Sequence, residues 1–270
     1  MAPIISSVVG FIVLAIVLWL IVVNVRCGKY NLIKVNKKGV PSKVTDEPVE
    51  CYVEVNGISM HYAVLGEGDP LVLIHGNGGS HEELTGLMRY LANDFQVFAP
   101  DSRNHGKSGQ TKELSYKLLT SDYNAFISAL GLKKPVVVGF SDGGIIAIQL
   151  AIDYPNLLKG FVAFGANSRP GGIKAHFRTW AKWKYLKDRN PMYRIMIEEP
   201  DLTKEHLEKI TTPAYIVAGE FDVIKLSDTA FLHKNIKSSR IAIVKSRGHD
   251  FCRRAPEIAY KIAREFFKTI

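Results

Sequence analysis

The sequence predicts an α/β protein with a doubly wound, mostly parallel sheet of eight strands, a short helical cap and one transmembrane helix in front. Two observations predict the sheet. Short apolar runs alternate with helical patterns along residues 50–270, which is typical of a parallel sheet covered by helices. Several of these runs, such as residues 70–75, are apolar almost without interruption, as strands buried on both faces are. A third observation, an uncharged N-terminal segment, predicts the membrane helix.

The N-terminal segment, residues 4–25, contains no charged side chain. A helix of this length measures about 33 Å, which matches a hydrocarbon core of about 30 Å. A cleaved signal peptide is the competing interpretation. It fits less well, because no Lys or Arg precedes the apolar run, the run is too long, and no A-x-A site follows it. We therefore expect residues 1–25 to be an uncleaved, single-pass membrane anchor.

Basic residues follow this segment and none precedes it, which predicts the orientation. The cluster consists of Arg26, Lys29, Lys34, Lys37 and Lys38. The positive-inside rule then leaves the C-terminal part on the cytoplasmic side of the cell membrane. Residues 26–49 are expected to be a basic flank and linker, since residues 39–49 carry two prolines and little apolar periodicity.

Charge and cysteine content exclude several functions. The net charge is +9, but no helix-turn-helix, zinc-finger or RNA-binding signature accompanies it, so no nucleic-acid partner is expected. The three cysteines, Cys27, Cys51 and Cys252, form no CxxC pair, which favours reduced thiols. The chain contains no H-E-x-x-H motif. We expect neither a metal ion nor another cofactor.

The elements of residues 50–270 follow in order. Asn56-Gly57 separates two short strand patterns, and this dipeptide is a strong hairpin signal. Further strands are predicted at residues 70–75, 95–100, 135–140, 159–166, 214–220 and 240–245. Helices are predicted at residues 81–92, 115–130, 143–153, 226–235 and from about 255 onward. Residues 168–212 interrupt this alternation and are expected to form a cap.

Polar residues follow several predicted strands, where doubly wound sheets bind their ligands. Ser141 follows residues 135–140, Asp222 follows residues 214–220, and His249 comes four residues after the last strand. A hydroxyl, a carboxylate and an imidazole are therefore expected at one edge of the sheet.

Five motifs in this order resemble those of the α/β-hydrolases, and the resemblance covers residues 50–270. Gly139-Phe140-Ser141-Asp142-Gly143 fits the G-x-S-x-G nucleophile elbow of that family. The other motifs are HGNGG (75–79), DSRNHGKSG (101–109), GEFD (219–222) and GHD (248–250). Asn104 stands where the family usually has glycine, and this departure is mild because Asn tolerates left-handed conformations.

The resemblance implies a role for each matched residue. Ser141 is expected to be the nucleophile, His249 its general base, and Asp222 the carboxylate that orients the imidazole. The backbone N–H groups of Asn77 and Asp142 are expected to form the oxyanion hole. The loops are expected to be shaped by His75, Gly76, Gly139 and Gly143.

The resemblance implies a serine hydrolase that cleaves a carboxylic ester through an acyl-enzyme. Relatives that cleave epoxides or carbon–halogen bonds use Asp where this chain has Ser141. A small-molecule ester is the expected substrate, and a lipid-derived ester suits both the anchor and the cap. C–C bond hydrolysis, thioester hydrolysis and acyl transfer stay open, because the same triad serves them. A non-catalytic binding module with a hydrolase fold is the alternative from another class.

The cap sequence allows two interpretations. Phe177, Trp180, Trp183 and Leu186 recur every three residues, which predicts one apolar helix face with basic residues around it. The helix is either an amphipathic lid that touches an anionic bilayer or a helix packed on the domain with a solvated basic face. We favour the packed helix.

Overall fold

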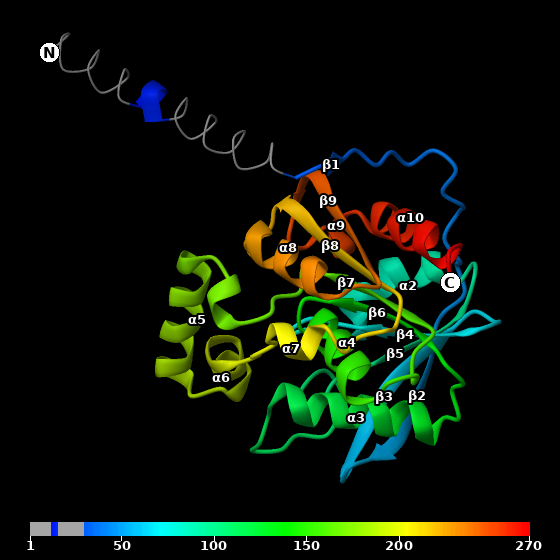
Figure 1. Ribbon diagram of the computed structural model, residues 1–270. Helices are drawn as coiled ribbons and strands as arrows, with labels where there is room; N and C mark the ends of the chain where they lie inside the picture. Colours follow the sequence, from blue (N-terminus) through cyan, green and yellow to red (C-terminus); the bar gives the residue numbers. More distant parts are fainter. Residues whose placement is uncertain (1–11, 16–29) are drawn as a thin grey trace, which may run out of the picture.

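A computed structural model describes residues 12–15 and 30–270. It contains a sheet with the strand order β1-β9-β8-β7-β6-β4-β5-β3-β2 (Figure 1). The strands are β1 (Leu32–Ile33), β2 (Val49–Val55), β3 (Ile58–Leu65), β4 (Pro70–Ile74), β5 (Gln96–Pro100), β6 (Val136–Phe140), β7 (Gly160–Phe164), β8 (Ala214–Phe221) and β9 (Ser239–Gly248). Only the β2–β3 and β3–β5 pairs are antiparallel. The mostly parallel, doubly wound sheet is therefore confirmed.

The antiparallel pair begins at the predicted hairpin. Asn56 and Gly57 connect β2 to β3, and both have positive φ angles, 44° and 75°. Two successive left-handed residues make the tight turn whose twist matches that of the flanking strands. The Asn-Gly signal therefore located this turn correctly.

Helices cover both faces of the sheet. They are η1 (His81–Leu84), α2 (Thr85–Leu91), α3 (Tyr116–Ala129), α4 (Asp142–Asp153), η2 (Pro170–Gly172), α5 (Ala175–Asp188), α6 (Pro191–Glu198), α7 (Lys204–Leu207), α8 (Leu226–Asn235), α9 (Phe251–Arg254) and α10 (Pro256–Phe267). One apolar core includes side chains of α3, α4 and α8. The other includes side chains of α2 and α10, on the opposite face. The short helix α9 was not predicted.

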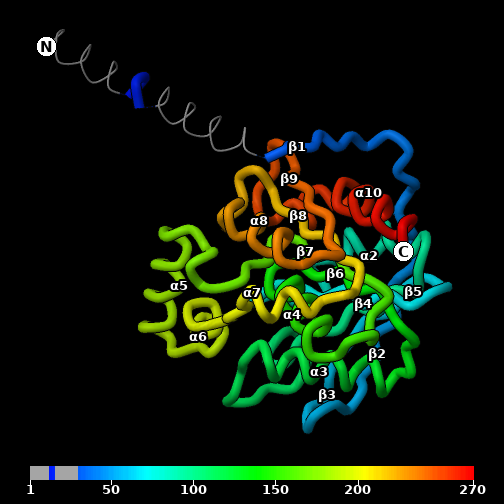
Figure 2. The backbone as a smooth tube through the Cα atoms, viewed as in Figure 1, coloured from blue at the N-terminus to red at the C-terminus, as the bar shows by residue number. Residues whose placement is uncertain are grey.

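The sheet has nine strands rather than the predicted eight, because the expected linker contributes one. Leu32 and Ile33 form β1 and pair in parallel with Ile243 and Val244 of β9. Residues 34–47 then continue along the surface of the domain, as the blue tube shows (Figure 2). We call residues 32–47 the strap.

Polar contacts hold the strap against α2 and α10. The Lys37 ammonium lies 2.6 Å from the Glu257 carboxylate of α10. The Arg89 guanidinium of α2 donates to the backbone carbonyls of Val44 and Asp46, at 3.2 and 2.6 Å. This part of residues 26–49 therefore packs on the domain instead of running free.

The predicted membrane span, residues 4–25, lies outside the described residues except for residues 12–15. A search of residues 12–15 and 30–270 finds no helix with the length and apolar character needed to cross a bilayer.

The cap lies to one side of the sheet, where α5 and α6 pack against each other (Figure 1). The two ends of the cap segment lie side by side, because Leu202 N–H donates to the Ser168 carbonyl at 2.8 Å. The expected apolar face of α5 packs only in part, because Phe177 is half-buried and Trp180 contacts Tyr193 of α6. Trp180, Trp183 and Leu186 stay 42%, 56% and 54% exposed, and only Ala181 of this helix is buried.

The spacing explains this departure from the packed-helix interpretation. Three residues advance an α-helix by 300°, so each apolar side chain of the series is offset by about 60° from the one before it. From Phe177 to Leu186 the series winds halfway around α5, and no single packing surface covers it.

Candidate active site

The turn from β6 into α4 presents Ser141 in a strained conformation. Ser141 has φ 54° and ψ −113°, which is rare for a residue with a Cβ and costs about 1–3 kcal/mol. Its N–H donates to the Phe164 carbonyl at 2.7 Å, and its carbonyl accepts from Gly144 N–H at 2.9 Å. These bonds fix the turn, so the hydroxyl projects from the end of the sheet.

Glycines make this turn possible. A Cβ added to Gly139 would lie 2.1 Å from the Gly143 carbonyl oxygen, and one added to Gly143 would lie 2.2 Å from the Ile74 oxygen. Because both obstacles are backbone atoms, neither can move aside. The predicted shaping role of Gly139 and Gly143 thus has a steric basis.

The structure brings together the three predicted side chains, each from the loop after a different strand. His249 Nε2 lies 3.1 Å from Ser141 Oγ. On the other side of the ring, His249 Nδ1 lies 2.6 Å from Asp222 Oδ1. Asp222 is buried and also accepts N–H bonds from Ile224 and Gly219, at 2.9 and 3.2 Å. These two bonds hold the Asp222 carboxylate in place independently of the imidazole.

Burial and charge act in opposite directions on this pair. Burial disfavours the protonated His249, but the adjacent Asp222 carboxylate outweighs it, so the pKa of His249 is raised. Burial also disfavours the ionised Asp222, yet the imidazole and two backbone N–H groups outweigh it and lower the pKa of that carboxyl. With Nδ1–H donated to Asp222, the neutral ring turns the lone pair of Nε2 toward the Ser141 hydroxyl.

Two backbone N–H groups are candidates for an oxyanion hole. The hydrogen bonds found among residues 30–270 include none donated by the N–H of Asn77 or of Asp142, the first residue of α4. His75 shapes the loop before Asn77: its Nδ1 donates to the Gly76 carbonyl at 2.7 Å, and its Nε2 accepts from Ser102 N–H at 2.9 Å. Burial lowers the pKa of His75, so the ring is neutral and suited to both bonds.

The side chains of Asn77 and Asp142 also meet, a contact that the sequence did not predict. Asn77 Nδ2 donates to Asp142 Oδ2 at 2.9 Å and to the Met192 carbonyl of α6 at 3.0 Å. Burial raises the pKa of the Asp142 carboxyl to about 6. One amide group therefore connects the glycine-rich loop, the elbow and the cap. No local motif signals a contact between residues 65 positions apart.

A cavity of about 600 Å³ opens beside Ser141 and His249. Its apolar side includes Phe140 and Val223 together with five cap residues, namely Phe177, Trp180, Met192, Tyr193 and Met196. Its polar side includes Asn77, Glu83, Asp250 and Arg253, and the Arg253 guanidinium lies 2.9 Å from the Glu83 carboxylate. The volume suits a small organic molecule.

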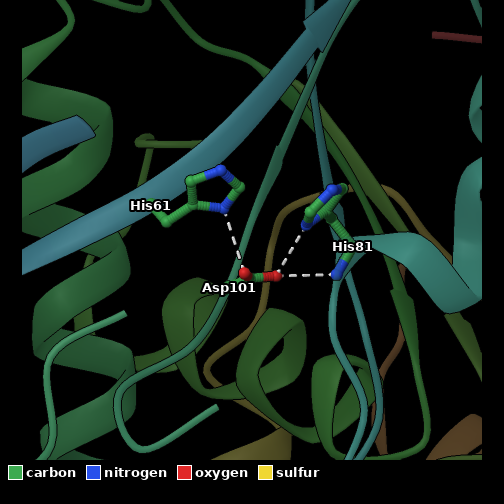
Figure 3. Close-up of side chains that lie close together, drawn as sticks. All are labelled: His61, His81 and Asp101. Carbon is green, nitrogen blue, oxygen red and sulfur yellow. Dashed lines mark hydrogen bonds and ion pairs between the residues drawn. The ribbon is translucent and has the colours of Figure 1, made fainter. Parts of the chain in front are cut away.

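Three buried side chains near the site, His61, His81 and Asp101, lie close enough to hold a metal ion (Figure 3). Their contacts instead form a hydrogen-bonded cluster. One Asp101 oxygen accepts from the His81 N–H and Nδ1, at 2.7 and 2.9 Å. The other accepts from His61 Nδ1 and Lys107 N–H, at 3.0 and 2.9 Å. The carboxylate therefore already has four donors.

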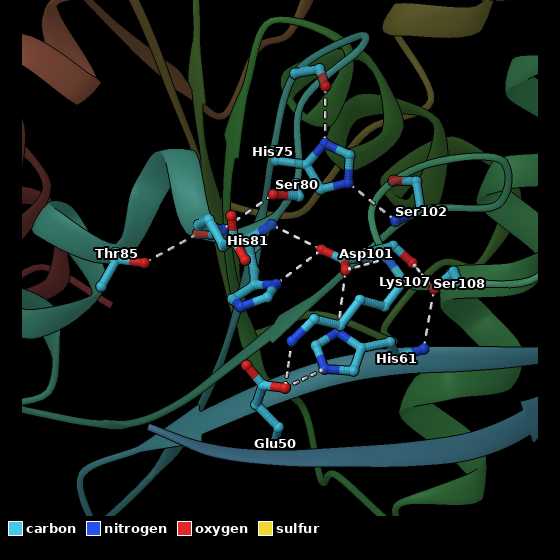
Figure 4. Close-up of polar contacts among 12 residues, drawn as sticks. Glu50, His61, His75, Ser80, His81, Thr85, Asp101, Ser102, Lys107 and Ser108 are labelled. Carbon is cyan, nitrogen blue, oxygen red and sulfur yellow. Dashed lines mark hydrogen bonds and ion pairs between the residues drawn. The ribbon is translucent and has the colours of Figure 1, made fainter. Parts of the chain in front are cut away.

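The Asp101 cluster braces the loops around the glycine-rich segment (Figure 4). His81 begins η1, which follows that segment, while Lys107 lies in the loop after β5. His105 in the same loop donates from Nδ1 to the Arg103 carbonyl at 2.8 Å, and burial lowers its pKa to about 4. The preceding Asn104 has φ 65°, a left-handed conformation that Asn tolerates. His81 and His105 thus make structural contacts within these loops.

The known proteins to which this chain is similar are hydrolases. Residues 69–193 match the family model described as alpha/beta hydrolase fold. The chain is 28% identical over 252 residues to "Serine hydrolase BPHL" of Homo sapiens, covering 80% of this chain and 85% of that protein. It is 31% identical over 157 residues to "sn-1-specific diacylglycerol lipase ABHD11" of Danio rerio, covering 57% of this chain but only 47% of that protein.

A solved structure shows the same fold. It is the meta-cleavage product hydrolase from Pseudomonas fluorescens IP01, with a TM-score of 0.68 and 20% identity. The similarity covers 81% of this chain and 97% of that one.

Proposed function

Because this chain is a hydrolase with the α/β-hydrolase fold, we propose that it cleaves a carboxylic ester by Ser-His-Asp catalysis through an acyl-enzyme. The observation that carries the proposal is the position of His249, whose two ring nitrogens contact Ser141 Oγ and Asp222 Oδ1 at 3.1 and 2.6 Å. A base in this position activates a serine hydroxyl, and its carboxylate partner stabilises the imidazolium that forms.

The proposed reaction has two halves. Ser141 Oγ attacks the ester carbonyl carbon while His249 Nε2 takes the hydroxyl proton. The resulting oxyanion accepts hydrogen bonds from the backbone N–H groups of Asn77 and Asp142, and the N-terminus of α4 stabilises its negative charge. His249 then protonates the departing alcohol, which leaves the acyl group on Ser141. Water attacks this second ester with His249 again as base, which releases the acid and restores Ser141.

A lipid-derived ester is the substrate class that we propose, and two features support it. Aromatic and methionine side chains of the cap form the apolar side of the cavity. One relative carries the name of a diacylglycerol lipase. A panel of nitrophenyl esters of increasing acyl length tests this. We expect a rate optimum at medium or long chains, whereas a steady fall beyond acetyl would indicate a small-ester enzyme.

We also propose that residues 4–25 anchor the enzyme in the cell membrane, with the catalytic domain on the cytoplasmic side. The uncharged apolar run and the basic residues after it support this. Alkaline carbonate extraction and protease protection of sealed membrane vesicles test it. A chain that carbonate removes from membranes would overturn the anchor without affecting the catalytic proposal.

Labelling with a fluorophosphonate probe tests the chemistry and separates an enzyme from a binding module. The native chain is expected to label, and Ser141→Ala to lose labelling and at least about 10⁴-fold in kcat. Ser102→Ala is the matched control, because its buried hydroxyl contacts Tyr123, at 2.8 Å. Folded native protein that does not label would favour the binding module.

A further inference from the structure

We infer that the outer face of α5 is a membrane-contact surface that binds an anionic lipid bilayer and guides an apolar ester chain from it toward Ser141. The surface consists of Trp180, Trp183 and Leu186 with the lysines beside them. The guidance of substrate depends on the proposed function, whereas the contact with the bilayer does not.

The first observation is the exposure of large apolar side chains on one side of a helix. Trp180, Trp183 and Leu186 are 42%, 56% and 54% exposed. The angular positions of an α-helix place Trp180 and Leu186 about 60° to either side of Trp183, so all three point outward together. Single exposed apolar residues are ordinary on a protein surface, but a group of this size on one helix face marks a contact with another apolar phase.

The second observation is the charge around this group. Residues 172–197 contain seven basic residues and one acidic residue, Asp188. Lys182 and Lys187 are exposed beside Trp183, and the Lys187 ammonium lies 5.5 Å from the centre of its ring. An apolar centre with a cationic border is complementary to acyl chains beneath anionic headgroups, and lysines near such a surface strengthen the attraction. The charge therefore favours an anionic bilayer over a neutral one.

The third observation is that this face continues into the cavity. Trp180 is exposed to solvent and also lines the cavity beside Ser141. Its ring lies 5.1 Å from that of Phe177 and 5.6 Å from that of Tyr193, and both of these residues line the same cavity. Apolar side chains thus lead from Trp180 on the outer face into the cavity that Ser141 lines, which suits an acyl chain that leaves the bilayer tail first.

Tryptophan fluorescence of the full chain tests the contact, because the sequence contains only three tryptophans. In Trp19→Phe, the two that remain are Trp180 and Trp183. This variant is reconstituted into phosphatidylcholine vesicles with or without phosphatidylserine, in which the phosphatidylcholine acyl chains are brominated or not. We expect brominated chains to quench the fluorescence in anionic vesicles and much less in neutral ones. Fluorescence that bromination leaves unchanged in anionic vesicles would overturn the inference.

Charge reversal gives a matched pair of variants in the Trp19→Phe background. Lys182→Glu with Lys187→Glu is expected to remove the quenching. Lys133→Glu with Lys134→Glu makes the same change in net charge at exposed positions between α3 and β6 and is expected to keep it. Equal quenching in both pairs would contradict the role of the cap lysines, as would equal quenching in neutral and anionic vesicles.

Substrate guidance needs a comparison of two substrates. Trp183→Glu is expected to lower the rate on a long-chain ester embedded in anionic vesicles and to leave kcat/KM for a water-soluble acetyl ester unchanged, because Trp183 does not line the cavity. An equal rate on the embedded ester would overturn the guidance. These outcomes are separate from those that test the proposed function. Quenching without Ser141-dependent hydrolysis would support the membrane-contact surface and contradict the esterase. Ser141-dependent hydrolysis without quenching would support the esterase and contradict the membrane-contact surface.

Discussion

His249 is placed so that one proton decides whether Ser141 is activated. The imidazole must be neutral to accept the hydroxyl proton, and the Asp222 carboxylate raises its pKa above the ordinary 6.5. We therefore expect kcat/KM to increase with pH through a midpoint above 6.5 and then to level off.

Replacing the carboxylate tests the cause of that shift. Asp222→Asn removes the charge that favours the imidazolium, so the midpoint is expected to move to lower pH while the plateau falls by about 10⁴. Stopped-flow or steady-state rates between pH 5 and 9 give both quantities. A midpoint that stays in place would mean that another group produces the pH dependence.

Asp142 gives a second pH dependence, in stability rather than in rate. Its pKa of about 6, against an ordinary 3.8, means that the folded chain holds this proton more tightly than the unfolded chain does. Stability contributed by this group is therefore present at low pH and lost as pH rises from about 4 to 6, by about 3 kcal/mol. Asp142→Asn cannot titrate, so its free energy of unfolding relative to native should increase by about that amount between pH 4 and 7.

Urea unfolding at several pH values measures this difference. Asp153→Asn replaces an exposed acid at the other end of α4 and is the matched control. Its free energy of unfolding should differ from that of the native chain by the same amount at every pH. A constant difference between Asp142→Asn and native across this range would contradict the prediction.

At the scale of elements, the elbow depends on the close approach of β4, β6 and α4. Gly143→Ala would place a Cβ 2.2 Å from the Ile74 carbonyl oxygen of β4, and that backbone cannot yield. We expect a loss of about 3 kcal/mol or more in the free energy of unfolding. Gly171→Ala, whose Cβ would meet nothing nearer than 3.9 Å, should stay within about 0.5 kcal/mol of native. Thermal unfolding of the two variants provides the comparison.

The elements that the sequence predicted well are those with strong local signals. The β2–β3 turn follows from Asn56-Gly57, and the strands β4 and β6 follow from uninterrupted apolar runs. Because parallel strands share one carboxyl edge, the meeting of Ser141, Asp222 and His249 was also predictable.

Long-range contacts could not be predicted in the same way. β1 is only two residues long and forms through pairing with β9, so its sequence carries no strand pattern. The contact between the side chains of Asn77 and Asp142 depends on how the glycine-rich loop folds back over the elbow. The three-residue spacing implies that part of the apolar series on α5 stays exposed, but which part does so depends on the side of the helix that meets α6.

At the scale of the whole molecule, the strap joins the edge of the sheet at β9 to the helices of one face. Removing residues 1–47 deletes β1 and the contacts of Arg89 and Glu257 with the strap. We expect this truncation to unfold about 5–10 °C below one that starts at residue 30, as a loss of about 2–3 kcal/mol would produce in a domain of this size. Differential scanning fluorimetry of both truncations measures this difference in melting temperature. Equal melting temperatures would mean that docking of the strap contributes no net free energy to folding.

The bond from the Asn77 amide to the Met192 carbonyl limits how this scaffold could be re-engineered. A chimera that receives the cap of another hydrolase, in order to acquire new selectivity, would keep every triad residue yet lose the acceptor that α6 provides. The Asn77 amide would then keep only its bond to Asp142, and the donor loop would lose its hydrogen bond to the cap. Grafts designed to retain a carbonyl at that place should preserve turnover, while equally well-folded grafts without one should be slow on every ester offered.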